Sequence, residues 1–399
     1  MGSATAVAAL MRSGRTAAAQ GSQEVVEPWK VLGRIPSEIG RRSAHVQVAR
    51  RVNRPLPSGE SETPLHLLDG IITPADLHFE RHHGGIPAID PARYQLLIHG
   101  LVNRPMVFSL ETLYRYPRLS RICFIECSGN GNRGYLESQI RPDLTPQQID
   151  GLTSTSDWCG IPLRLLLREV GVRPGAKWFL AEGADASLMT RSIPIEKGWD
   201  DAMIALMQNG EPLRPEQGYP ARLLLPGWEG NSSVKWLRRI DVSDRPFMTR
   251  EETSKYTDPL PNGTARIFSF DMDAKSTITY PTYPVRLRDP GWYEISGLAW
   301  SGRGRIQRVD VSVDGGQRWQ RAALDEPVLP KCHTRFRLAW RWTGKPALLM
   351  SRAVDETGYV QPTRKELLAV RGPATSYHMN SIRAWQVDAD GAITFGVKP

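Results

Sequence analysis

The sequence predicts an α+β domain over residues 40–262, followed by an all-β sandwich over residues 265–399. Two observations indicate this fold class. Up to about residue 250, short apolar runs alternate with helical stretches, whereas beyond residue 265 the apolar residues follow the period of two that is typical of strands. The 399 residues are enough for two or three domains of about 150 residues each.

Three segments of the first half justify the α+β assignment. Residues 94–100 and residues 177–181 are short apolar runs that predict strands. Between them we expect a short helix over residues 161–171, with Pro162 in its first turn and Gly171 just past its end.

Alternation of apolar and polar residues justifies the sandwich. Val309, Val311 and Val313 alternate with polar residues and lead into a turn signal at residues 314–316. Residues 335–342, RFRLAWRW, alternate large apolar side chains with arginine and alanine. Because aromatic residues at strand period are usually core residues, we expect the tryptophans of this half to be buried.

Composition and charge exclude several classes of protein. No run approaches the ~18 consecutive apolar residues of a membrane helix, so we expect no membrane span. Lys and Arg outnumber Asp and Glu by 51 to 42, a net charge of +9, which favours an anionic partner. Since the basic residues are spread along the chain rather than gathered into a patch, we expect no nucleic-acid binding.

The four cysteines are Cys123, Cys127, Cys159 and Cys332. They form no CxxC pair of the kind found in zinc ribbons and no CxxCH motif, so we expect no c-type haem in this chain. They are also too few for a disulfide framework. One of them is better interpreted as a metal ligand.

The N-terminal residues 1–30 are interpreted as a leader. Residues 2–21 are rich in Ala, Ser, Thr and Gly and end in small residues, so they resemble the tail of an export signal. A disordered leader is the alternative interpretation. On the first interpretation, the protein is exported and periplasmic.

The segment ECSGNGNR, residues 126–133, follows the apolar run at residues 122–125. A strand is therefore expected to end at Cys127, and the glycines and asparagines after it permit tight turns that present one thiol to a site. A buried structural thiol is the alternative, because free cysteine is often buried.

Two further segments carry charged residues beside glycines. In HFERHHGGIP, residues 78–87, an arginine is bracketed by three histidines, although a surface loop would also fit. In residues 218–242, Arg222 opens a strand and Lys235 follows a loop rich in Gly, Asn and Ser. Two cations beside such a loop suit a phosphate, although the GxxxxGK[ST] pattern of a P-loop is absent.

These segments, together with EGAD at residues 182–185 and SKYTDP at residues 254–259, resemble the sulfite oxidase family of molybdenum enzymes. The resemblance covers nearly the whole chain. It implies a catalytic domain that binds one molybdopterin and a C-terminal immunoglobulin-like sandwich that forms a homodimer. Within the family, the strings FERHHGG, TREETSKYTDPLPNGTAR and RAVDETGYVQPTR most resemble the molybdenum subunit of sulfane dehydrogenases.

The resemblance assigns roles to individual residues. Cys127 matches the thiolate that ligates molybdenum, Arg81 matches an arginine facing the metal and the anionic substrate, and Tyr256 matches an active-site tyrosine. The residues expected to contact the pterin or its phosphate are Phe79, Arg81, His82, His83, Asp185, Gln217, Arg222, Ser233, Val234 and Lys235. Gln217 departs from the histidine of the animal enzymes, but its amide can still donate and accept hydrogen bonds.

The resemblance implies molybdenum-dependent oxidation of a reduced sulfur anion, with sulfane sulfur on a carrier protein as the expected substrate. Water would supply the oxygen, and a separate c-type cytochrome would receive the electrons. The alternatives are a dehydrogenase of free sulfite, a reductase of protein methionine sulfoxide, which would lack the sandwich, and a basic binding protein without activity.

Overall fold

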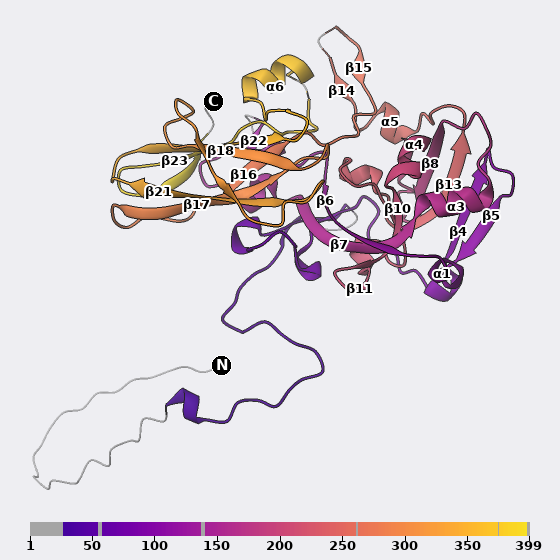
Figure 1. The fold of residues 1–399 in the computed structure, drawn as a ribbon, viewed down its shortest axis with the longest axis horizontal. Coiled ribbons are helices and arrows are strands. Elements are labelled where there is room, and N and C mark those ends of the chain that lie inside the picture. The colour runs from indigo at the N-terminus through magenta and orange to yellow at the C-terminus, as the bar shows by residue number, and fades with distance from the viewer. Residues whose placement is uncertain (1–26, 55–57, 137–139, 261, 374, 397–399) are drawn as a thin grey trace, which may run out of the picture. The chain divides into compact units, whose positions relative to one another are not determined.

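The computed structural model describes residues 27–54, 58–136, 140–260, 262–373 and 375–396 (Figure 1). The chain divides into two compact units, residues 1–47 and residues 48–399. The first unit contains one short 3₁₀ helix, η1 (Pro28–Lys30), among its described residues. Residues 1–26 of the predicted leader lie outside the described part of the chain, so the leader stays a prediction.

The first half of the larger unit contains three sheets and short helices, as the predicted α+β class requires. A small sheet with the order β1-β2-β3 carries the segment 78–87 at its last strand. Its strands are β1 (Arg51–Arg54), β2 (Glu60–Glu62) and β3 (Glu80–Arg81).

The second sheet has the order β11-β10-β7-β6, with β12 paired to β10, and all its pairs are antiparallel. Its strands are β6 (Leu119–Glu126), β7 (Thr153–Pro162), β10 (Met203–Gln208), β11 (Glu211–Pro212) and β12 (Arg222–Leu224). This sheet positions both the cysteine segment, at the end of β6, and Arg222, at the start of β12.

The third sheet has the order β5-β4-β13-β8-β9, in which β4 and β13 run parallel. Its strands are β4 (Gln95–Gly100), β5 (Met106–Ser109), β8 (Trp178–Gly183), β9 (Thr190–Pro194) and β13 (Leu237–Ser243). The strands predicted at residues 94–100 and 177–181 are confirmed as β4 and β8.

Helix α3 (Leu163–Val170) covers the core between these sheets. Leu163, Leu166, Leu167 and Val170 recur at helical spacing and are all fully buried. The helix ends at Gly171, whose φ of +67° favours glycine. The prediction of this helix was correct except for its start, because residues 161 and 162 extend β7 instead.

The remaining helices of the first half are short. The α-helices are α1 (Leu110–Tyr114), α2 (Pro146–Asp150), α4 (Ile195–Asp200) and α5 (Arg250–Thr253). The 3₁₀ helices are η2 (Leu65–Leu67), η3 (Ala75–Leu77), η4 (Pro91–Arg93), η5 (Asn132–Gly134), η7 (Pro215–Gln217) and η8 (Gly230–Ser232). No helix among the described residues is both long and apolar enough to cross a membrane.

The second half is the predicted all-β sandwich, drawn in orange and yellow in Figure 1. A hairpin of β14 (Asp258–Pro259) and β15 (Ala265–Arg266) leads into it. One sheet has the order β16-β17-β21-β20 and the other the order β19-β18-β22-β23-β24. The strands are β16 (Lys275–Tyr280), β17 (Gly291–Trp300), β18 (Ile306–Ser312), β19 (Gln320–Arg321), β20 (Ala323–Leu324), β21 (Thr334–Trp342), β22 (Ala347–Asp355), β23 (Ala384–Val387) and β24 (Ile393–Gly396).

Four of the six tryptophans of this half are buried as predicted. Trp300, Trp340, Trp342 and Trp385 are at most 9% exposed, whereas Trp319 is only partly buried and Trp292 is 71% exposed. The sandwich also contains helix α6 (Arg364–Arg371), which the sequence analysis did not predict. Its start carries a capping box between Thr363 and Glu366, a signal that could have found it.

The sandwich packs against the sheet that carries Cys127. Phe124 of β6 lies in one buried cluster with Met272, Leu298 and Trp300. The imidazole of His333 lies 3.0 Å from the hydroxyl oxygen of Thr153 and is stacked on the ring of Phe124. The end of β6 is therefore held from both halves of the chain.

Candidate active site

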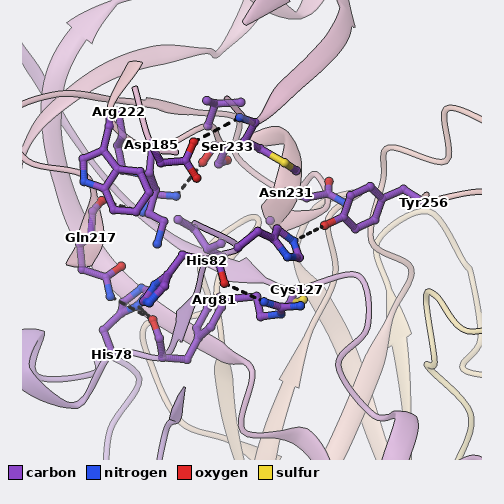
Figure 2. A pocket seen from close by; sticks show the side chains of 18 residues that line it. His78, Arg81, His82, Cys127, Asp185, Gln217, Arg222, Asn231, Ser233 and Tyr256 are labelled. Carbon is purple, nitrogen blue, oxygen red and sulfur yellow. Dashed lines mark hydrogen bonds between the residues drawn. The ribbon is translucent and has the colours of Figure 1, made fainter. Parts of the chain in front are cut away.

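One cavity collects every residue that the sequence analysis proposed for the site (Figure 2). Counted out to its open mouth, the space between the protein atoms of this cavity is about 690 Å³. The predicted residues that line it are Phe79, Arg81, His82, His83, Cys127, Asp185, Gln217, Arg222, Ser233, Val234, Lys235 and Tyr256. In Figure 2, Cys127 and Arg81 lie at one side, and Arg222 and Gln217 lie at the opposite side.

The cavity is also lined by six residues that were not proposed from the sequence. They are His78, Ile125, Met189, Gly230, Asn231 and Trp236. His78 could have been predicted from the sequence, since it is the first residue of the segment 78–87, which also contains Arg81. Its ring is buried, and burial lowers its pKa to about 3, so it is neutral at pH 7.

Cys127 follows directly after the last residue of β6 and is the cysteine that faces the cavity. Burial raises the pKa of its thiol, and the positive charge of Arg81 opposes that shift. Cys123 and Cys332 are almost fully buried, and burial raises the pKa of each thiol to about 12. Cys127 is therefore the accessible thiol, whereas Cys123 and Cys332 are buried and unreactive. Cys159 does not line the cavity.

The loop after Cys127 turns back at once. The amide of Asn130 donates to the carbonyl oxygen of Cys127 at 2.8 Å, and the amide of Cys127 donates to the carbonyl of Leu152 at 2.9 Å. Gly131 has a φ of +97°, and a Cβ there would lie 2.6 Å from a guanidinium nitrogen of Arg383. Glycine is favoured here by the positive φ, and a Cβ would also lie 2.9 Å from the carbonyl oxygen of Met379.

Arg222 and Lys235 are two cations that form no ion pair with a carboxylate in the described part of the chain. The guanidinium of Arg222 donates to the carbonyls of Gln217 (3.1 Å) and Ser233 (2.8 Å), and its Nε is buried with no partner among the described residues. Lys235 donates to the carbonyl of Glu216 at 3.0 Å, and it forms no ion pair with the described carboxylates.

The electrostatics of these two cations indicate a ligand. Burial lowers the pKa of Arg222 to about 9, and burial with the charge of Arg222 lowers the pKa of Lys235 to about 7. A buried charge without a counterion is costly, so a bound anion would stabilise both side chains in their charged forms. Arg222 and Lys235 thus fit a phosphate group.

Arg81 is held in place by its own segment and by residues 58–60. Its guanidinium donates to the hydroxyl of Ser58 at 3.1 Å and to the carbonyl of His82 at 2.9 Å, and it lies 3.6 Å from a carboxylate oxygen of Glu60. Glu60 is not predictable from the local sequence, because nothing near it marks it as the partner of Arg81.

Tyr256 closes the cavity beside His83. Its hydroxyl lies 3.2 Å from Nε2 of His83, and the guanidinium of Arg191 lies over its ring at 5.1 Å. Burial raises the pKa of the Tyr256 phenol, so the hydroxyl keeps its proton. Burial, together with the charges of neighbouring arginines, lowers the pKa of His83 to about 4, so its ring is neutral.

Three of the remaining predicted residues form hydrogen bonds with backbone groups around the cavity. Gln217 donates to the carbonyl of Phe79 at 2.9 Å, and the hydroxyl of Ser233 accepts from the amide of Leu225 at 3.0 Å. Asp185 accepts from the amide of Met189 at 3.2 Å. These contacts fix the loops around the cavity before any ligand binds.

Comparison with known proteins identifies the domains of this chain. Residues 83–251 match the family described as the oxidoreductase molybdopterin binding domain, and residues 266–384 match the Mo-co oxidoreductase dimerisation domain. The fold is similar to the crystal structure of the sulfane dehydrogenase SoxCD from Paracoccus pantotrophus. The TM-score is 0.89 and the sequences are 46% identical, over 94% of this chain and 98% of that one.

Plant nitrate reductases are similar in sequence. The chain is 32% identical to nitrate reductase [NADH] 2 of Phaseolus vulgaris and 33% identical to inducible nitrate reductase [NADH] 2 of Glycine max, over 71% of its own length in each case. It spans about a third, 35%, of the length of these relatives. The shared domains and the 46% identity to a protein that it covers almost entirely show that the chain belongs to the sulfite oxidase family of molybdopterin oxidoreductases.

Proposed function

We propose that this chain is the molybdenum-binding subunit of a sulfane dehydrogenase, which oxidises sulfane sulfur held on a carrier protein. The observation that carries the proposal is that the thiol of Cys127, Arg81 and two cations without an ion pair to a described carboxylate all line one cavity. The 46% identity to a sulfane dehydrogenase, against 32–33% to nitrate reductases, favours a sulfur substrate over nitrate.

The side chains of the cavity fit the molybdenum cofactor. The thiol of Cys127 would hold molybdenum, because a soft thiolate suits that metal. Arg222 and Lys235 would hold the phosphate of the pterin, and the feature that fits it is that neither side chain forms an ion pair with a described carboxylate. The residues that would line the pterin are Phe79, His82, His83, Asp185, Gln217, Ser233 and Val234.

When bound, the cofactor supplies two-electron redox chemistry and oxygen transfer to sulfur, which no side chain can perform. The protein orients the substrate and compensates its charge. Arg81 carries a permanent positive charge beside Cys127 and would bind the anionic sulfur group. Tyr256 keeps its proton and would donate a hydrogen bond toward the reacting oxygen, while the neutral ring of His83 orients its hydroxyl.

The partners and location belong to the same proposal. Water would supply the oxygen, and the electrons would pass to a separate c-type cytochrome. The match of residues 266–384 to a dimerisation domain supports a homodimer formed through the sandwich. The small-residue segment at residues 2–21 supports export to the periplasm.

The test is turnover by the purified holoenzyme with three substrates: a thiosulfate-loaded sulfur-carrier protein, free sulfite and nitrate, with a c-type cytochrome or a redox dye as electron partner. We expect the highest kcat/KM with the loaded carrier. Preference for free sulfite would establish the sulfite dehydrogenase alternative. Reduction of nitrate as the fastest reaction, or absence of molybdenum from active protein, would contradict the proposal.

A further inference from the structure

The segment that carries Cys127 is held by residues from the sandwich as well as by its own sheet. The indole nitrogen of Trp300 in β17 donates to one carboxylate oxygen of Glu126 at 2.7 Å. The ammonium of Lys275 in β16 donates to the other oxygen at 3.0 Å. Both oxygens of the residue directly before Cys127 are therefore bonded to the second half of the chain.

The rest of the loop is held in the same way. The amide of His378 donates to the carbonyl of Ser128 at 2.8 Å, and the guanidinium of Arg383 donates to the carbonyl of Gly131 at 3.3 Å. Lys275 also reaches the carbonyl of Asn130 at 3.4 Å. Contacts from the sandwich thus reach both sides of the loop that presents the thiol.

The charges around Lys275 balance one another in the interior. Its ammonium lies 2.8 Å from Asp150 and 3.0 Å from Glu126, and Arg383 lies 3.9 Å from Asp150. All four side chains are at most 5% exposed. Removing one member of such a buried network leaves another charge uncompensated, so its neighbours must move or bind water.

We propose that Lys275 and Trp300 are positioning residues, which fix the orientation of the Cys127 sulfur through the carboxylate of Glu126. On this proposal the sandwich has a second role besides dimerisation, because Lys275 and Trp300 hold the residue directly before the metal ligand. This inference rests on the proposed function, in which Cys127 holds molybdenum. Residues that orient a metal ligand typically change activity or metal affinity by about 10–100-fold when they are lost.

The test compares three single variants of the full-length holoenzyme. Lys275→Met removes the ammonium at similar length, and Trp300→Phe removes the indole N–H together with part of the buried ring. The control is Lys197→Met, since Lys197 is also a buried lysine with an ion pair, to Asp201 at 2.6 Å, but it bonds to the carbonyl of Pro226 rather than to the cysteine loop. The readouts are molybdenum per chain, the thiolate-to-molybdenum bands in visible circular dichroism, and the separate values of kcat and KM.

We expect Lys275→Met and Trp300→Phe to shift the thiolate bands and to lower kcat by about 10–100-fold with little change in KM. Lys197→Met should lose stability but keep the wild-type bands. Trp300→Phe decides the question if Lys275→Met does not fold. Wild-type bands and kcat in the variants that fold, or an equal shift in Lys197→Met, would overturn the positioning role alone. Wild-type protein without molybdenum would overturn the proposed function itself, and the positioning role with it.

Discussion

The Nε2 atom of His83 lies 3.2 Å from the hydroxyl oxygen of Tyr256, and this contact joins two segments that are 173 residues apart. Both groups are neutral at pH 7, because burial lowers the pKa of His83 to about 4 and raises that of the Tyr256 phenol. The contact is therefore a hydrogen bond between uncharged groups, and it sets the direction of the one phenol that lines the cavity among the described residues.

Replacing Tyr256 by Phe removes this hydroxyl and keeps the ring. We expect kcat/KM for the sulfur substrate to fall by about 10²-fold, as when one donor to a developing negative charge is lost. The control is Tyr377→Phe, because the ring of Tyr377 lies 5.3 Å from that of Tyr256 but does not line the cavity. Equal kinetics in the two variants, measured by stopped-flow turnover, would remove Tyr256 from the chemistry.

Replacing Arg81 by Gln removes the cation that lies beside Cys127. We expect kcat/KM to fall by an amount equivalent to about 2–4 kcal/mol of barrier, with molybdenum content near that of the wild type. Arg81→Lys should recover part of the loss, since an ammonium keeps the charge without the bidentate geometry. Unchanged kinetics in metal-replete Arg81→Gln protein would place the arginine outside the substrate site.

The Arg81 variants also leave Glu60 without its partner at 3.6 Å. The double variant Arg81→Gln with Glu60→Gln separates that effect from the loss of substrate binding. If substrate binding is the main role of Arg81, the double variant should be as slow as the single one. Recovery of activity in the double variant would show that the unpaired carboxylate caused the defect.

The sandwich and the first half of the chain share a buried interface, so a chain that ends at residue 262 should be poorly soluble. Truncation would expose Phe124, and it would leave Glu126 and Asp150 without the ammonium of Lys275.

The full-length protein should be a homodimer, so light scattering should give twice the mass of one chain. A soluble truncated chain that binds molybdenum, or a monomeric full-length protein, would contradict this account of the second half.

His333 makes the stability of the interface depend on pH. Burial lowers its pKa to about 3, from 6.5 in the unfolded chain, so the unfolded state binds the proton more readily. The contribution of the neutral ring is fully present above pH 6.5 and is lost as the pH falls from 6.5 toward 3. Between pH 6.5 and pH 5 the loss from this group should be about 1.6 kcal/mol, because the slope rises to 1.36 kcal/mol per pH unit only below pH 6.5.

The variant His333→Gln should make this dependence less steep, because glutamine does not titrate and can still bond to Thr153, while His78, His82 and His83 still contribute to it. Unfolding midpoints measured from pH 7 to pH 4.5 compare it with the control His45→Gln, whose side chain is exposed. An equally steep loss of stability in His333→Gln and in the wild type would assign the effect to another group.

The sequence was sufficient for those parts of the site that depend on local pattern. The end of β6 at Glu126, the glycine-rich turn after Cys127 and the start of β12 at Arg222 are each encoded within about ten residues. The family resemblance then selected which of these side chains share one cavity, and every residue that it selected lines that cavity.

The contacts that the sequence analysis missed are formed between distant segments. Glu60 pairs with Arg81, Arg191 pairs with Glu229 and Glu252, and Lys275 pairs with Glu126 across 149 residues. A charged residue in a sequence is far more often solvated than buried, so nothing local distinguishes these members of buried networks. Their partners become visible only when the strands are assembled.

The central claim is that Cys127 supplies a thiolate to molybdenum in this cavity, and X-ray absorption at the molybdenum edge tests it most directly. The spectrum of the wild-type holoenzyme should show one sulfur neighbour more than that of Cys127→Ser, while Cys159→Ser, which changes a cysteine outside the cavity, should match the wild type. Cys127→Ser should also lose turnover of the sulfur substrate but keep much of its pterin, because Arg222 and Lys235 are unchanged. The same number of sulfur neighbours in Cys127→Ser and in the wild type would contradict the account.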